Sequence, residues 1–298
     1  MSNPAAAILR ALRPKQWTKN AVVLAPLIFA LGDPNQNITL ATALQIALAA
    51  AAIFCLASSG IYILNDLRDI ELDRQHPTKR QRPFAAGDLP LGLGWTLTPL
   101  LLLGALALAT LLDPTFAISI AAYILLQLCY TFGLKRIALV DIMIIAAGFV
   151  LRALAGALAI HVDISPWLLL CTLLLALFLA LCKRRHELVI LDGREGHSRP
   201  SLRGYDPRLL DILVSMIAAA TLIAYCLYTL WPDTVAKFGS HKLGFTIPFV
   251  VFGLFRYLDL VYRHERGGRP EQLLLTDLPL AITVLLYGGT VFTLLAIR

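Results

Sequence analysis

Charged side chains are scarce in this sequence: Asp, Glu, Lys and Arg make up 15% of its 298 residues, whereas 58% are apolar. This number of charged groups is too small to cover the surface of a soluble globular protein. The chain must therefore use lipid as its outer solvent. The sequence also lacks the short segments of alternating polarity that a membrane β-barrel requires, because stretches such as 40–64 and 166–182 are apolar on every face. The composition predicts an all-α integral membrane protein.

Cysteine motifs are missing as well. The five cysteines have no C-x-x-C spacing and fall within or at the ends of apolar runs, which favours small core residues over metal ligands or disulfides. Residues 1–19 are basic but lack an apolar core followed by a small-residue cleavage site, so we expect the first span to be retained. We find no internal repeat and no separate soluble segment, and therefore expect one membrane domain over residues 1–298.

Long apolar runs recur along the whole chain. Each is long enough, at about 1.5 Å per residue, to cross a hydrocarbon layer of about 30 Å. We expect about nine membrane-spanning helices, at residues 17–32, 38–64, 91–112, 115–133, 138–160, 165–182, 208–231, 243–261 and 277–297.

The connections between these runs alternate in charge. Residues 1–19 and the connections 65–90, 133–137, 183–208 and 256–269 are rich in Lys and Arg, whereas the intervening connections hold few basic residues. By the positive-inside rule the basic side faces the cytoplasm. The sequence therefore predicts a multi-pass protein of the plasma membrane with a cytoplasmic N-terminus and a polar face on the cytoplasmic side.

The second run ends in an acidic motif, Asn-Asp-Leu-Arg-Asp-Ile-Glu-Leu-Asp. At about 100° per residue, Asp66, Asp69 and Asp73 fall on one helical stripe. Three carboxylates on one face repel each other unless a cation lies among them, and such oxygen ligands suit magnesium, which completes its shell with water and substrate phosphate. We predict a catalytic magnesium site at these aspartates. The alternative is a solvated acidic helix end that pairs with Arg68 and Arg74.

A cationic loop, His-Pro-Thr-Lys-Arg-Gln-Arg-Pro, follows the aspartates directly. A ligand with several negative charges could be held both by a metal on the aspartates and by Lys79, Arg80 and Arg82. In the fifth run, Asp141 and Arg152 lie about three helical turns apart and share one face. An arginine at that depth should face a polar cavity, and a purely structural ion pair with Asp141 is the alternative.

These motifs resemble those of the UbiA superfamily of intramembrane prenyltransferases. The resemblance rests on N-D-x-x-D-x-x-x-D at 65–73, on Arg-Pro-Lys-Gln-Trp at 13–17, and on the element from Tyr130 to Lys135. It implies helices around a central cavity that opens to lipid, and Mg²⁺ held by aspartates to bind a diphosphate leaving group. It also makes Asn65, Lys15 and Tyr130 candidate substrate-binding residues.

The sequence departs from the superfamily pattern where most members carry a second aspartate-rich motif. Lys183, Arg184 and Glu187 stand there, so cationic groups replace most of the second carboxylate set, which favours a site that holds more phosphate and less metal. This combination resembles the members that act as decaprenyl-phosphate phosphoribosyltransferases. That resemblance implies 5-phosphoribosyl 1-diphosphate as donor and a polyprenyl phosphate as acceptor.

In the implied mechanism, magnesium on the aspartates grips the donor diphosphate while the ionised lipid phosphate attacks the anomeric carbon. The basic residues are candidates for the remaining anionic groups. Lys183, Arg184 and Glu187 would hold the ribose 5-phosphate and hydroxyls, Lys135, Arg136 and Arg152 the diphosphate or lipid phosphate, and Arg13, Lys15 and Lys19 would attract the lipid head.

Other functions stay open at this point. An aromatic prenyltransferase of quinone biosynthesis would need an intact second carboxylate cluster, for which Glu187 and Asp192 are a poor substitute. A transporter would explain the spans but not the aspartate stripe, and an inverted repeat is missing. The basic loops contain too few interleaved aromatic residues to favour nucleic acid. Small-residue stretches at 47–52 and 146–159 are compatible with a homo-oligomer.

Overall fold

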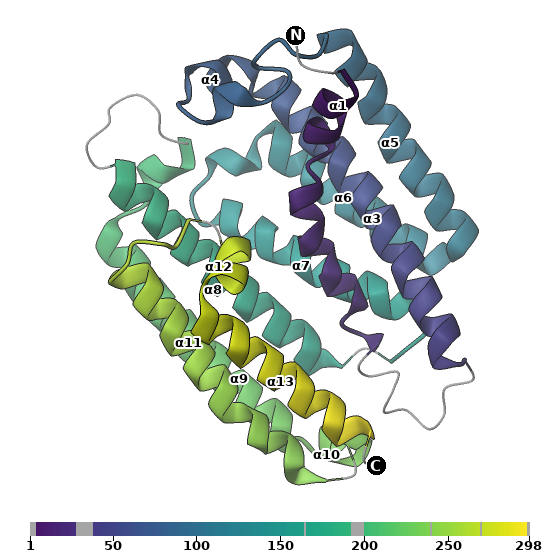
Figure 1. The fold of residues 1–298 in the computed structure, drawn as a ribbon, viewed down its shortest axis with the longest axis vertical. Coiled ribbons are helices and arrows are strands. Elements are labelled where there is room, and N and C mark those ends of the chain that lie inside the picture. Colours follow the sequence, from purple (N-terminus) through teal and green to yellow (C-terminus); the bar gives the residue numbers. More distant parts are fainter. Residues whose placement is uncertain are drawn as a thin grey trace.

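The structure, a computed structural model, describes residues 4–27, 38–163, 165–191, 200–238, 240–268 and 270–296. Every regular element in these ranges is a helix (Figure 1). In chain order they are α1 (Pro4–Leu12), η1 (Pro14–Leu24), α3 (Leu40–Arg68), α4 (Ile70–Gln75), η2 (Lys79–Gln81), α5 (Leu91–Leu112), α6 (Pro114–Phe132), η3 (Leu134–Arg136), α7 (Val140–Ala159), α8 (Pro166–Leu191), η4 (Pro200–Gly204), α9 (Pro207–Leu230), α10 (Pro232–Phe238), η5 (His241–Thr246), α11 (Ile247–Tyr262), α12 (Pro270–Thr276) and α13 (Leu278–Ala296).

Seven of the described helical segments are long and apolar enough to cross a membrane. They comprise α3, α5, α6, α7, α8, α9 and the continuous segment His241–Tyr262, and α13 contains a shorter apolar stretch, Leu278–Leu294. Eight of the nine expected spans thus coincide with helices, which confirms the all-α, multi-pass membrane architecture. The full count of nine is not reached in the described part of the chain.

The first expected span, 17–32, lies only partly within the described residues. Residues 14–24 form the 3₁₀ helix η1, and residues 28–32 lie outside the described ranges. Within this segment, Trp17 donates to Ser59 and Asn20 donates to Ser58 of α3. The segment is thereby held against α3 and α7.

Successive long helices pack beside one another, α3 on α5, α5 on α6, α6 on α7, α7 on α8 and α8 on α9. Of the four buried apolar clusters that the described residues form, the two largest lie among α3, α5, α6 and α7 and among α7, α8, α9 and α11. Large side chains left outside these clusters, such as Leu103 and Leu111 of α5, are exposed and suited to lipid. Helix α7 belongs to both clusters and so joins the two halves.

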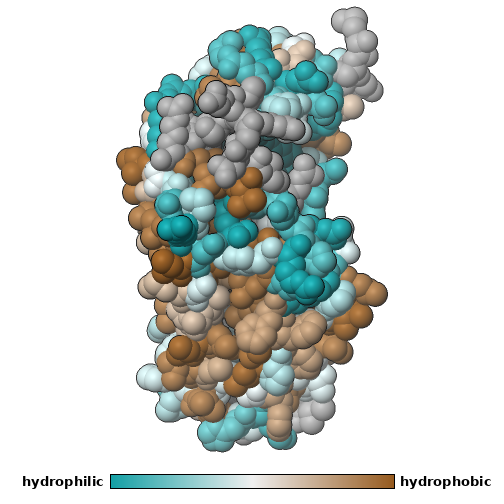
Figure 2. Space-filling model, turned by 90° about the vertical axis from the view of Figure 1, so that its left-hand side faces the viewer, coloured by the Kyte–Doolittle hydropathy of each residue, from teal (hydrophilic) through white to brown (hydrophobic). Residues whose placement is uncertain are grey.

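Polar and apolar surfaces are segregated along the molecule. Figure 1 shows α4 and the N-terminus at the upper end, and α10 and the C-terminus at the lower end. In the face drawn in Figure 2, hydrophilic residues gather over the upper half, whereas the lower half is mostly hydrophobic. The basic connection that follows α3 therefore lies at the polar end of the bundle.

Candidate active site

The three predicted aspartates lie where α3 gives way to α4. Helix α3 ends at Arg68, and Asp69 occupies its C-cap with φ −101° and ψ 12°. Hydrogen bonds from Asp69 N to Asn65 O (3.0 Å) and from Asp73 N to Asp69 O (2.8 Å) carry the chain across this break. The expected single stripe on one continuous helix is therefore wrong.

The break separates the aspartates into a pair and a single residue. Asp66 and Asp73 converge on one atom, Nη1 of Arg82, which lies 3.0 Å from Asp66 Oδ1 and 2.6 Å from Asp73 Oδ2. Asp69 turns instead to Lys135, whose Nζ is 2.6 and 2.7 Å from its two carboxylate oxygens. Among the described residues, no three His, Cys, Asp or Glu side chains come together as a metal site.

Burial makes the Asp66–Asp73 pair unusual. Both residues are only 2% exposed. Asp66 Oδ2 is buried and accepts no hydrogen bond from any described residue. A buried carboxylate oxygen without a partner carries a large desolvation cost. This oxygen is therefore poised to accept a cation or a hydrogen-bond donor.

Three cations reach the aspartates from three separate segments. Arg13 comes from the turn between α1 and η1, Arg82 from the loop after η2, and Lys135 from η3. Arg13 lies in the left-handed region, with φ 55°, and its guanidinium donates to Asp66 while lying 5.1 Å from the Tyr62 ring. Burial lowers the pKa of Arg13, although Asp66 opposes this shift.

Asn65 and Thr131 connect this site to α6. Thr131 Oγ1 lies 3.0 Å from Asn65 Oδ1 and 2.8 Å from Gln127 O, and Asn65 Nδ2 donates to Ile61 O over 3.1 Å. The Asn65 side chain is thus held by its own helix, α3, and by α6. Thr131 is not among the residues that the sequence predicts for the site, although it lies within the element from Tyr130 to Lys135.

A second polar cluster surrounds Asp141, which is fully buried at the start of α7. Its Oδ2 accepts from Arg184 Nε (2.8 Å) and Ser201 Oγ (3.1 Å), and its Oδ1 accepts from Tyr205 OH (2.6 Å). Arg184, 1% exposed, also pairs with Glu187. Burial and the bond to Asp141 raise the pKa of Tyr205. Ser201 and Tyr205 were not found from the sequence, because neither belongs to a motif.

Arg152 has a different environment from the one expected. Eleven residues along a helix is a rise of about 16 Å, so a shared face does not bring Arg152 to Asp141. The guanidinium of Arg152 instead donates to Asn20 Oδ1 (2.8 Å), Tyr123 OH (2.9 Å) and Gly148 O (3.0 Å). The structural ion pair weighed as an alternative is thus not formed, and Arg152 fastens η1 to α6 and α7.

The other basic candidates lie at the surface of the same end. Lys15, Lys79, Arg80 and Arg136 are exposed, and Lys183 is half-buried in α8. Tyr130 is buried at the end of α6 and interacts electrostatically with Arg184, which places the two polar clusters near each other. Asp192 lies outside the described residues.

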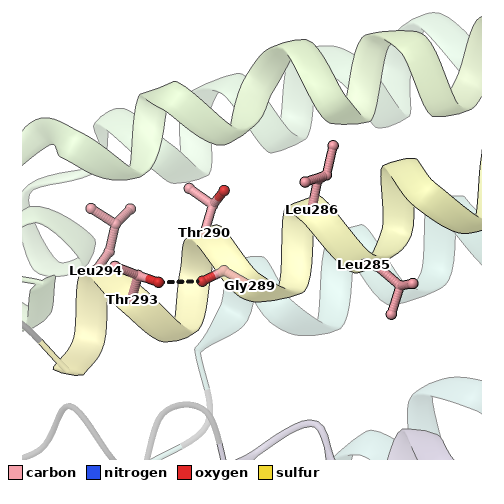
Figure 3. A pocket seen from close by; sticks show the side chains of 6 residues that line it. All are labelled: Leu285, Leu286, Gly289, Thr290, Thr293 and Leu294. Carbon is pink, nitrogen blue, oxygen red and sulfur yellow. Dashed lines mark hydrogen bonds between the residues drawn. The ribbon is translucent and has the colours of Figure 1, made fainter.

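A pocket of about 340 Å³ lies on α13, far from these clusters (Figure 3). Its lining is apolar or weakly polar: Leu285, Leu286, Gly289, Thr290, Thr293 and Leu294. The Thr293 hydroxyl donates to Gly289 O over 2.8 Å and so is already satisfied by its own helix. This surface has no charged group to bind a phosphate, and it is separate from the candidate active site.

Comparisons with known proteins agree with this architecture. The model of the UbiA prenyltransferase family matches residues 21–278. The chain is 36% identical to a decaprenyl-phosphate phosphoribosyltransferase of Mycolicibacterium smegmatis, over 97% of this chain and 92% of that protein. It is 35% identical to the protein of the same name from Mycobacterium tuberculosis, over 97% and 94%.

Solved structures give the same fold. A UbiA homologue from Archaeoglobus fulgidus, bound to DMAPP and Mg²⁺, superimposes with a TM-score of 0.73 at 18% identity, over 98% of this chain and 99% of that chain. The family model covers most of the chain, and the identities exceed 30% over nearly its full length. The chain belongs to the UbiA prenyltransferase family.

Proposed function

We propose that this protein transfers the 5-phosphoribosyl group of 5-phosphoribosyl 1-diphosphate to a polyprenyl phosphate and releases diphosphate. Its near full-length similarity to decaprenyl-phosphate phosphoribosyltransferases carries the choice of donor and acceptor. The site supports the same choice, because buried aspartates and several cations at the polar end suit a ligand with several phosphate groups.

The aspartates fit a magnesium ion. Asp66 and Asp73 share one cationic atom between them, and Asp66 Oδ2 has no partner among the described residues. Hard oxygen ligands of this kind are those that magnesium takes, together with phosphate oxygens of a substrate. We assign Asp66 and Asp73 as the main ligands and Asp69 as a further one. Magnesium bound there would neutralise charge on the leaving diphosphate.

The basic residues divide into two groups by their contacts. Exposed or half-buried cations at the polar end could contact phosphate without breaking a buried network, whereas Arg152 and Arg184 are committed to interior partners. We therefore assign Arg152 and Arg184 to positioning the fold. Lys15, Lys79, Arg80, Arg82, Lys135, Arg136, Lys183 and, for the ribose hydroxyls, Glu187 remain our candidates for substrate contact, near Asn65 and Tyr130.

The reaction requires little acid or base chemistry from these residues. A phosphate oxygen of the lipid forms a bond to the anomeric carbon as the bond from that carbon to the diphosphate oxygen breaks, and the electron pair leaves with the diphosphate. The lipid phosphate is already ionised, so the protein's main task is to hold two anions close together and to screen their repulsion. Cations from three chain segments around one acidic site provide such screening.

The direct test is phosphoribosyl transfer by purified protein. Radiolabelled 5-phosphoribosyl 1-diphosphate, a polyprenyl phosphate and magnesium should give label in the organic phase, and omission of the metal or the lipid should abolish it. Absence of labelled lipid, with prenyl transfer from a polyprenyl diphosphate to an aromatic acid, would replace this proposal with aromatic prenyl transfer. We place the reaction at the cytoplasmic face, from the charge of the connections.

A further inference from the structure

Arg82 occupies a position between two carboxylates that a metal ion could also occupy. A single atom of Arg82, Nη1, contacts both Asp66 and Asp73. Arg13 donates to Asp66 Oδ1, the same oxygen that Arg82 contacts. Two buried carboxylates that both contact one atom need positive charge between them, because like charges repel each other and buried charges lose their hydration. The arginines supply this charge but leave Asp66 Oδ2 without a partner among the described residues.

We propose that Arg82 and Arg13 are exchangeable counter-ions, which hold the Asp66–Asp73 pair in the free protein and move to the donor diphosphate when a divalent cation takes their place. This inference rests on the proposed metal site but not on the identity of the sugar donor. The two arginines then have a role both in the free protein and in the complex with metal and diphosphate. In the free protein they compete with the metal, and in the complex they contact the ligand.

The origin of the two arginines makes such an exchange possible. Neither belongs to a spanning helix: Arg82 is in the loop after η2, and Arg13 is in the turn before η1. Their side chains are 26% and 24% exposed, whereas the two carboxylates are almost fully buried. The guanidinium groups can therefore turn toward solvent while the aspartates stay fixed on their helices. Planar guanidinium groups also match phosphate oxygens in a bidentate manner.

The exchange couples the two binding events. A metal that binds alone must displace the arginines from the carboxylates and leave them without an anion. A metal that binds together with a diphosphate gives the displaced arginines new partners. Metal and diphosphate should therefore each strengthen the binding of the other, and this coupling should depend on Arg82 and Arg13.

The test measures metal binding in the absence of any sugar donor or lipid. Manganese, whose free ion is detected by electron paramagnetic resonance, is titrated into purified wild-type protein and the variant Arg82→Gln. Because the variant removes the competing cation, it should bind Mn²⁺ at least about fivefold more tightly than the wild type. Equal or weaker binding by Arg82→Gln would overturn the proposal, because an arginine that only supports the site would weaken it when lost.

Matched variants locate the effect. Arg74→Gln removes the same charge from an exposed pair with Glu71 on α4 and should bind Mn²⁺ like the wild type. Asp66→Asn should abolish the binding that Arg82→Gln strengthens. Asparagine tolerates the left-handed backbone found at position 13. The variant Arg13→Asn should therefore also tighten Mn²⁺ binding. If Arg82→Gln does not fold, Arg13→Asn must show tighter Mn²⁺ binding than the wild type for the proposal to stand, because it also removes a cation from Asp66.

The assay separates this inference from the proposed reaction. Tighter Mn²⁺ binding by Arg82→Gln together with failed phosphoribosyl transfer would reject the reaction and keep the exchange. Successful transfer together with unchanged Mn²⁺ binding would keep the reaction and reject the exchange.

Discussion

Asp66 lies where the charges of the candidate site meet, because its carboxylate contacts both Arg13 and Arg82 at 2% exposure. We expect Asp66→Asn to lower the rate of phosphoribosyl transfer at least about 100-fold, since a neutral amide neither binds magnesium well nor neutralises the two arginines. Initial rates of label transfer to lipid would measure this loss, and thermal unfolding in detergent would show that the variant is folded.

Glu71 provides the control for Asp66. It belongs to the same acidic motif, but its side chain is 74% exposed and pairs only with Arg74 among the contacts of the described chain. Glu71→Gln should keep the transfer rate within about twofold of the wild type, because an exposed pair contributes little. A wild-type rate for Asp66→Asn, or equal losses in both variants, would remove Asp66 from the metal site.

A change at Asp141 can show whether the buried Arg184 stabilises the fold or binds substrate. Asp141→Asn would leave its guanidinium without the carboxylate that Arg184 Nε contacts, at 1% exposure. Breaking such a buried pair costs about 3–5 kcal/mol, so the unfolding temperature in detergent should fall clearly. Asp163→Asn, in an exposed loop, should leave it unchanged. A stable Asp141→Asn protein with a raised KM for the donor would instead make Arg184 a substrate ligand.

At the scale of elements, η1 depends on a close contact with α7. A Cβ atom added at Gly156 would lie 2.0 Å from Val23 O, which is backbone and cannot rotate away. Gly156→Ala should therefore push η1 from α7 and destabilise the protein by about 1–3 kcal/mol. Because η1 begins next to Arg13, the variant should also lose transfer activity. Unfolding temperature and initial rate, measured on the same preparation, check both effects.

Gly104 is the matched control for Gly156. It lies in the spanning helix α5, and a Cβ there would meet nothing within 4 Å. Gly104→Ala should be neutral or slightly stabilising, because alanine is the better helix former. If both alanine variants behave alike, the contact between Gly156 and η1 does not hold the segment in place.

Sequence reasoning located most elements because length and apolarity are local properties. The expected span 91–112 coincides with α5, and the expected spans near α6 and α7 differ by one or two residues. It did not predict the 3₁₀ form of η1, whose position depends on the contact of Asn20 with Arg152, 132 residues later in the chain. It failed likewise for the break at Asp69, whose partner Lys135 is 66 residues away.

The candidate site shows the same division. The aspartates and Arg82 were recognised because they belong to one motif and its adjoining loop. The partners of Asp141 were not, because Ser201 and Tyr205 are single residues in a connection that the fold brings back to the start of α7. The proximity of residues that are close in the sequence could be predicted, whereas the pairing of distant residues could not.

At the scale of the whole molecule, the basic connection that follows α3 lies at the polar end of the bundle. The chain crosses from α3 through α5, α6 and α7, so the connection after α3 and the loop after α7 should lie on opposite sides of the membrane. The excess of Lys and Arg in the connection after α3 predicts that it faces the cytoplasm. A donor with several phosphate groups is dissolved in an aqueous compartment. The orientation of the protein therefore decides from which side of the membrane the donor can reach the aspartates.

Cysteine labelling in whole cells can test this orientation. In a variant without the five native cysteines, Arg80→Cys marks the exposed basic loop and Asp163→Cys marks the exposed loop after α7. A membrane-impermeant maleimide should label Asp163→Cys in intact cells and Arg80→Cys only after permeabilisation. The reverse pattern would place the aspartates outside the cell, where a cytoplasmic donor cannot reach them, and would reject the proposed reaction even if the purified protein bound magnesium. Labelling of both sites in intact cells would contradict three membrane crossings between them.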